Sequence, residues 1–100
     1  MKFRLVILDE VFAELNEAAL YYEERQDSLG LALLEEFESA LIRISKNPES
    51  FQKKYKNFRQ SLLNRFPYLV LFEIDESSVV IYRFINARRH PQKRFNKVNK

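Results

Sequence analysis

The sequence predicts an α+β domain, with an N-terminal strand and an antiparallel helical hairpin packed on a mainly antiparallel sheet of four or five strands. Between residues 9 and 46, apolar residues recur every three or four positions, which is the spacing of amphipathic helices. Strand-like stretches rich in branched and aromatic residues lie before and after this region. Short polar segments join the later stretches, so neighbouring strands there should be antiparallel.

Length and composition indicate a single folded unit. A chain of 100 residues with 46% hydrophobic content is expected to form one domain over residues 1–100. The absence of cysteine excludes disulfides and thiolate metal sites. No apolar run reaches the ~18 residues of a membrane span, and the N-terminal stretch becomes charged too early for a signal peptide. We therefore expect a cytoplasmic protein with no membrane contact.

Charge is distributed unevenly along the chain. The net charge is +3, but residues 51–100 hold twelve basic and three acidic residues, which gives +9. The N-terminal half must therefore carry −6, because the two halves sum to the total. Such asymmetry indicates an anionic partner for the C-terminal half.

The N-terminal half predicts one strand and two helices. Residues 3–8 are apolar on both faces, which favours a strand inside the sheet. One helix is expected over Asp9–Arg25 and a second over Ser28–Lys46, which ends at Asn47-Pro48. Gly30 near the start of the second helix could allow close backbone approach. The predicted core comprises Phe12, Leu15, Tyr22, Leu33, Phe37, Leu41, Ile44, Leu5, Ile7, Val70, Phe72 and Ile81.

The C-terminal half predicts the rest of the sheet. Residues 51–55 form a short strand or an extended arm, and residues 58–66 alternate with Arg59 and Arg65 on one side. Residues 68–74 and 79–85 form a hairpin with a loop of about four residues. This hairpin leads into Asn86–Pro91, and the tail over residues 92–100 is the segment that we expect to be flexible.

Several short strings in this order resemble one known superfamily over nearly the whole chain. They are the helical hairpin ending at Asn47-Pro48, Arg59, the string Phe66-Pro67-Tyr68-Leu69-Val70, and the exit Ala87-Arg88-Arg89-His90-Pro91 followed by Phe95. Together they resemble the RelE/ParE superfamily of bacterial type II toxins. The resemblance implies a toxin that a cognate antitoxin neutralises. RelE-like members cut mRNA on the ribosome, whereas ParE-like members poison DNA gyrase. The long hairpin and the Phe66-Pro67-Tyr68 string look more like ParE and plasmid-stabilisation proteins.

The nuclease alternative would need proton carriers and cations at a phosphate. Arg59, Arg83 and His90 are the catalytic candidates, since arginine suits phosphate and His90 titrates near neutrality. One histidine serves one proton transfer, and Phe95 lacks the hydroxyl that RelE-like toxins often place near the C-terminus. This departure favours inhibition by binding, and leaves any enzymatic activity, an endoribonuclease if one exists, as the alternative.

Target or nucleic-acid binding has its own candidate residues. They are Arg59, Arg65, Arg88, Arg89 and His90. The structural alternatives are a solvated sheet face for Arg59 and Arg65, a helix-glutamate partner for Arg83, and a backbone-bonding role for His90. One histidine, one glycine and no cysteine indicate no metal site, no phosphate loop and no cofactor.

The expected partners are a cognate antitoxin together with either DNA gyrase or the ribosome and its mRNA. The antitoxin segment should add a strand to a sheet edge or lay a helix in a groove. A homodimer or a toxin–antitoxin hetero-oligomer would both fit this picture. A third alternative is a degenerate, non-toxic protein that keeps only antitoxin binding.

Overall fold

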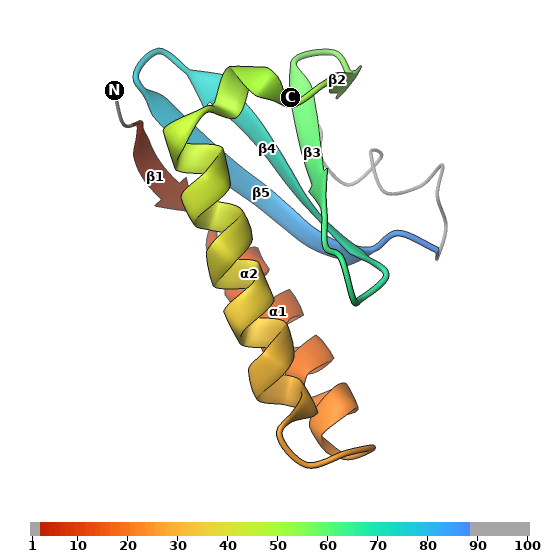
Figure 1. The fold of residues 1–100 in the computed structure, drawn as a ribbon. Helices are drawn as coiled ribbons and strands as arrows, with labels where there is room; N and C mark the ends of the chain where they lie inside the picture. Colours follow the sequence, from red (N-terminus) through yellow and green to blue (C-terminus); the bar gives the residue numbers. More distant parts are fainter. Residues whose placement is uncertain (1–2, 89–100) are drawn as a thin grey trace.

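The computed structural model describes residues 3–88, and it confirms the predicted α+β fold (Figure 1). In the sequence, two long helices lie between the first strand and the other four strands, and the five strands form one mixed sheet. In chain order the elements are β1 (Arg4–Ile7), α1 (Asp9–Glu23), α2 (Leu29–Lys46), the 3-10 turn η1 (Pro48–Ser50), β2 (Lys53–Tyr55), β3 (Phe58–Leu62), β4 (Tyr68–Asp75) and β5 (Ser78–Asn86). No helix in this described part of the chain is long and apolar enough to cross a membrane.

The sheet has the strand order β1-β5-β4-β3-β2. Strand β1 runs parallel to β5, and the other neighbours are antiparallel, as the short connections predict. The hairpin between β4 and β5 is tighter than predicted, because Asp75 already pairs with Ser78. Glu76 in this turn has a φ of 57°, a backbone conformation that a tight hairpin turn requires.

Strand β1 lies at an edge of the sheet, so its predicted internal position is wrong. It pairs with β5 on one side, and Leu5 and Ile7 pack against the core while Arg4 is exposed. Val6 remains 37% exposed, although it is apolar. The sequence pattern was misleading because Val6 faces away from the helices and no element covers it from that side among the described residues.

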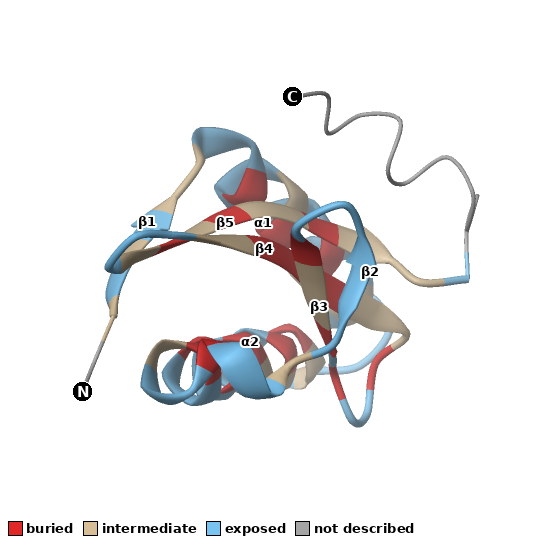
Figure 2. Cartoon of the chain, turned by 90° about the horizontal axis from the view of Figure 1, so that it is seen from above, coloured by how far each residue is buried: buried red, intermediate tan, exposed pale blue. Residues whose placement is uncertain are grey.

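Both helices pack on one face of the sheet and share one core with it. Figure 2 shows α2 lying along one side of the curved sheet. The main core contains Val11, Leu15 and Ala18 from α1, Leu33, Phe37, Ala40, Leu41 and Ile44 from α2, and Val70, Phe72, Val79, Ile81 and Phe84 from the sheet. A smaller cluster of Phe58, Leu69 and Leu71 occupies the other face of the sheet.

Phe12 is the clear failure of the predicted core, because it is 47% exposed. Val11, which is fully buried, takes the core position in the first turn of α1 instead. Adjacent helix positions differ by about 100° around the axis, so Val11 and Phe12 cannot both face the sheet. The buried stripe is therefore Val11, Leu15 and Ala18, with Tyr22 half-buried at its end.

The turn between the helices is held by a side chain that the sequence does not single out. Glu23 accepts hydrogen bonds from the backbone N–H groups of Ser28 and Gly30, both at 2.9 Å, and so caps the start of α2. Ser28 has a φ of 71° and makes no side-chain cap bond, so the side chain that caps α2 is that of Glu23. The predicted close approach at Gly30 is confirmed, because a Cβ there would lie 2.5 Å from the Ala19 carbonyl oxygen.

Candidate functional site

Arg83, a nuclease candidate, is committed to an ion pair with Glu14 of α1. Its Nε donates to Glu14 Oε2 at 2.7 Å, and its Nη2 contacts the same oxygen. The other carboxylate oxygen of Glu14 accepts the backbone N–H of Phe84 at 2.8 Å. The two side chains are only 13% and 21% exposed. The structural alternative for Arg83, a partner glutamate on a helix, is therefore confirmed.

Arg59 is also bound within the fold, although not to an acid. Its Nη1 donates to the backbone carbonyls of Phe51 at 2.6 Å and Glu49 at 3.3 Å. These carbonyls belong to the segment that leads from η1 to β2, so Arg59 fastens this segment to β3. Pairing with Phe72 places Arg59 on the helix-covered face of the sheet, where it is half-buried.

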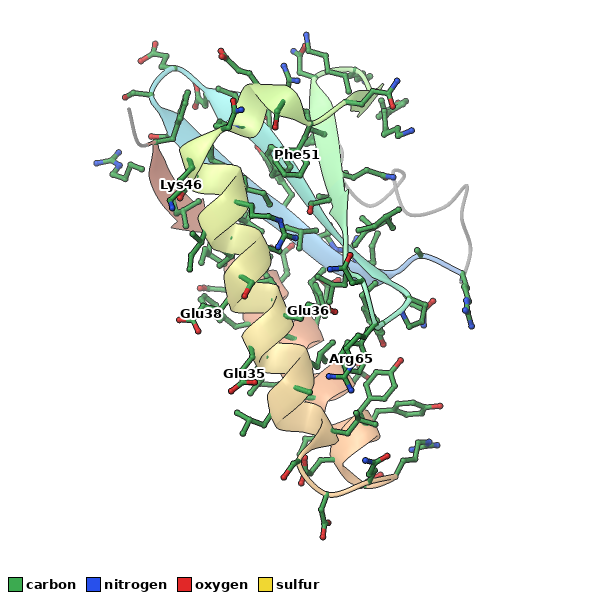
Figure 3. All side chains as sticks on the ribbon, in the orientation of Figure 1. Glu35, Glu36, Glu38, Lys46, Phe51 and Arg65 are labelled. Atoms are coloured by element: carbon green, nitrogen blue, oxygen red, sulfur yellow. The ribbon has the colours of Figure 1, made fainter. Side chains whose placement is uncertain are left out.

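Arg65 lies in the loop between β3 and β4, not on the strand that the alternation predicted. Strand β3 ends at Leu62, and a hydrogen bond from the N–H of Leu63 to the carbonyl of Tyr68 at 2.9 Å closes the turn that follows. The backbone N–H of Arg65 donates to the Glu36 carboxylate at 3.2 Å, and Figure 3 shows Glu36 turned toward it. The Arg65 guanidinium carbon lies 5.6 Å from the Phe66 ring centroid, and the side chain is exposed.

Arg88 follows the end of β5 and is exposed. Its backbone N–H donates to Asn86 Oδ1 at 2.8 Å, which fixes the start of the exit segment. Arg89 and His90, the other two candidates in this segment, lie outside the described residues.

Aromatic rings bring Arg65 and Arg88 into one neighbourhood. Tyr22 of α1 makes edge contacts with Phe66 and Tyr68, with ring centroids 4.9 and 6.3 Å apart. Tyr21 packs edge-on against Tyr22, and Arg25 covers the Tyr21 ring at 3.5 Å. We call Tyr21, Tyr22, Arg25, Arg65, Phe66, Tyr68 and Arg88 the aromatic–arginine patch. It joins the C-terminal half of α1 to the β3–β4 loop and the end of β5.

The pKa of Tyr22 depends on its burial and on the charged and aromatic groups around it. Burial raises the pKa of Tyr22 above its usual value, and the neighbouring Tyr68 and Tyr21 raise it further. Arg88 and Arg25 act in the opposite direction on the Tyr22 pKa. The phenol is therefore neutral at physiological pH and can donate a hydrogen bond, but it cannot serve as a general base there.

Such a patch is suited to contact an anionic or acidic surface. Exposed guanidinium groups supply charge and donors, and the exposed ring of Tyr21 supplies flat apolar area. Among residues 3–88, no group of three or more potential ligand residues could hold a metal ion.

The comparisons with known proteins fix the family. A family model described as the ParE toxin of the type II toxin–antitoxin system parDE matches residues 5–91. The chain belongs to the ParE toxin family. This ParE-family chain is thus a toxin of a type II toxin–antitoxin system, and the preference for ParE over RelE is confirmed. Membership implies a cognate antitoxin as its partner.

Solved structures agree with this ParE fold. The chain is similar to a chain of the chromosomal ParDE toxin–antitoxin system from P. aeruginosa, with a TM-score of 0.75 and 13% sequence identity. The alignment covers 85% of this ParE-family chain and 96% of the other chain, and at this identity it supports the fold. No curated protein matches the sequence.

The sequence reasoning missed part of the patch in this ParE-family protein. Tyr22 was predicted only as a core residue, and neither Tyr21 nor Arg25 was among the binding candidates. The four-residue spacing of Tyr21 and Arg25 within the predicted helix Asp9–Arg25 was the available signal, because such residues are neighbours on a helix surface.

Proposed function

We propose that this ParE-family toxin stops growth by binding DNA gyrase through the aromatic–arginine patch, and that it is not an RNA-cleaving enzyme. The cognate antitoxin would neutralise it by binding. The observation that carries the proposal is the different use of the arginines. Arg59 and Arg83 are bound within the fold, whereas Arg65 and Arg88 are exposed beside the tyrosines.

The chemistry of RNA cleavage supports the same choice. A nuclease needs a base and an acid at one phosphate. Residues 3–88 contain no histidine, and Tyr22 holds its proton at neutral pH because burial raises its pKa. Arg83, a half-buried nuclease candidate, has its charge balanced by Glu14. A surface for binding is therefore a better description of the described residues than a catalytic centre.

Two assays run side by side would test the proposal. The purified chain should inhibit DNA supercoiling by purified gyrase and should leave mRNA intact on ribosomes. The double variant Arg65→Ala with Arg88→Ala should lose about tenfold or more in inhibitory potency, because it removes two exposed cations from the patch. The matched control Lys53→Ala with Lys54→Ala also removes two charges, but from β2, and should keep its potency.

Other outcomes have defined meanings. Ribosome-dependent mRNA cleavage without gyrase inhibition would replace the proposal with the endoribonuclease alternative. Growth without arrest when the chain is expressed alone, together with a stable antitoxin complex, would identify the degenerate antitoxin-binding alternative. Equal loss of potency in the patch variant and the β2 control would remove the patch from the proposal.

A further inference from the structure

The hairpin of β2 and β3 concentrates positive charge at one edge of the sheet. Residues 53–59, with the sequence KKYKNFR, hold four basic residues and no acidic one. Lys53, Lys54 and Lys56 are exposed, and none of them forms an ion pair with another residue of the stretch 3–88. We call residues 53–59 the basic hairpin.

The base of the basic hairpin is fixed to the rest of the fold. Arg59 Nη1 donates to the carbonyl of Phe51 at 2.6 Å, which ties the segment before β2 to β3. The Phe51 ring packs edge-on against Phe72 in the core, with centroids 5.5 Å apart, and Phe58 packs in the same way against Tyr82 at 5.1 Å. The lysines therefore project from a supported hairpin.

A register shift divides the side chains of β2 between the two sides of the basic hairpin. Lys53 pairs with Arg59 and Tyr55 pairs with Phe58, so Lys54 is an extra residue between the two pairs. Paired residues share a face of the sheet. Lys53 thus shares the helix-covered face with Arg59, and Tyr55 shares the opposite face with Phe58.

The turn adds charge on the side of Tyr55. Lys56 has a φ of 51°, which is uncommon for a residue other than glycine, asparagine or aspartate. Its Nζ lies 5.3 Å from the centroid of the Tyr55 ring. Lysines on an edge strand block pairing with other chains, but Lys56 lies in the turn and has no such role. Positive charge therefore lies on both sides of the basic hairpin.

Acidic side chains lie outside the basic hairpin. Glu49 of η1 is the one acid between residues 48 and 59, so this stretch keeps a net charge of +3. Glu73 and Asp75 belong to β4, which β3 separates from β2 by roughly 10 Å, and Figure 1 shows the turn after β4 at the opposite corner from β2. An anion that approaches the β2 edge therefore meets lysine first.

We infer that the basic hairpin binds the phosphate backbone of duplex DNA. Lysine binds phosphate as a point charge, and each such contact releases counterions from the DNA. A two-stranded ribbon fits the major groove, which is bordered by phosphates on both sides. Charge on both sides of the basic hairpin suits this groove, whereas a single strand would pass along one side. Phosphate contacts do not read sequence, so we expect binding without sequence preference.

The basic hairpin and the aromatic–arginine patch are separate surfaces. The turn of the basic hairpin precedes β3 and the loop that holds Arg65 follows it, and five strand residues span roughly 17 Å. Figure 3 shows Arg65 well below Phe51, which lies toward the β2 end of the sheet. The inference therefore does not depend on gyrase as the target.

Fluorescence anisotropy with the purified full chain and a labelled duplex of about 20 base pairs tests the inference. The triple variant Lys53→Ala, Lys54→Ala and Lys56→Ala should weaken binding at least about tenfold, and should lower the slope of log affinity against log salt by about two to three. Arginine at the same three positions keeps the charge and should keep binding. Arg59 stays unchanged, because it holds the segment before β2.

A matched control removes the same charge elsewhere. Arg4→Ala, Arg43→Ala and Lys46→Ala change three exposed residues of β1 and α2, and should weaken binding by less than about threefold. Circular dichroism and thermal unfolding should show an unchanged fold in all three triple variants. An equal loss of affinity in the two alanine variants would overturn the inference, because only net charge would then matter.

Two competitors distinguish duplex DNA from other anions. Tighter binding of a single-stranded oligonucleotide of the same length would overturn the duplex assignment. Polyglutamate that competes as strongly as unlabelled duplex would assign the basic hairpin to acidic proteins instead. The variant Lys53→Ala with Lys54→Ala should keep gyrase inhibition while it loses DNA binding, so that failure of either proposal is visible without the other.

Discussion

Glu14 of α1 and Arg83 of β5 form an ion pair that joins the helical hairpin to the sheet, although 69 residues separate them in the sequence. Glu14 also accepts the backbone N–H of Phe84, so one carboxylate satisfies a charge and a backbone donor together. Strand β5 shifts register against β4 beside this point, between the pairs of Leu71 and Phe72. The contact therefore fixes where α1 crosses the sheet.

Removing Glu14 should destabilise the fold. Glu14→Gln leaves the Arg83 charge unpaired in a mostly buried place and should cost about 2–4 kcal/mol of unfolding free energy. Urea unfolding of the variant measures this cost. Glu17→Gln, one turn along on the exposed side of α1, is the control and should change stability by less than about 0.5 kcal/mol. Equal effects of the two variants would show that the pair does not hold the helix.

Gly30→Ala should destabilise the protein despite alanine's better helix propensity. The propensity gain is about 1 kcal/mol at most, but the new Cβ would lie 2.5 Å from the Ala19 backbone oxygen. Backbone cannot rotate away as a side chain can, so overpacking of about 1–3 kcal/mol should dominate. Thermal unfolding gives the sign. Ser39→Ala, an exposed position of the same helix, should raise stability slightly, and a stabilised Gly30→Ala would contradict the close packing.

Stability should fall at alkaline pH through Tyr22. Burial raises its pKa in the folded state above the usual tyrosine pKa of 10.0, so the folded chain holds this proton more tightly than the unfolded chain. The stabilisation is complete below pH 10.0 and is lost as pH rises through the folded-state pKa. Unfolding from about pH 9 to about pH 11 should show a decline that is smaller in Tyr22→Phe. The same slope in both proteins would contradict a raised pKa at this tyrosine.

Substitutions in the exit segment, Ala87 to Pro91, test whether inhibition depends on positive charge. The double variant Arg88→Ala with Arg89→Ala should weaken target binding and reduce toxicity in proportion, because it removes two cations of the exit segment. Binding of the wild type should itself weaken as salt rises, since contacts between exposed charges are screened within about 10 Å at 0.1 M salt. Supercoiling inhibition at two salt concentrations measures both effects. Inhibition that changes neither with salt concentration nor with loss of these arginines would exclude an electrostatic contact.

His90→Gln should leave toxicity largely intact, because glutamine keeps a polar group and removes only the titrating one. Growth arrest on expression and binding of the antitoxin are the measurements. Loss of toxicity and of mRNA cleavage, with the fold and antitoxin binding preserved, would replace the binding mechanism with the endoribonuclease.

Local spacing was enough to predict the helices, the antiparallel strands and most of the core from sequence. Leu33, Phe37 and Ile44 recur at helical intervals on a strongly amphipathic segment, so their burial follows from the helix alone. The Asn47-Pro48 step likewise ends α2, because the residue before proline avoids helical backbone angles. These features depend on residues within a few positions of one another.

Only the tertiary structure decided how the charged residues are used. Arg83 pairs with Glu14, which lies 69 residues away in the sequence, and Arg59 donates to carbonyls near η1. No pattern among neighbouring residues indicates either contact. Phe12 and Val6 remain exposed because a helix or an edge strand is covered from one side, and a hydrophobic residue does not specify which side. The aromatic–arginine patch joins α1, the β3–β4 loop and the end of β5 for the same reason. Sequence periodicity determines which residues share a face, but packing between distant elements determines which faces meet.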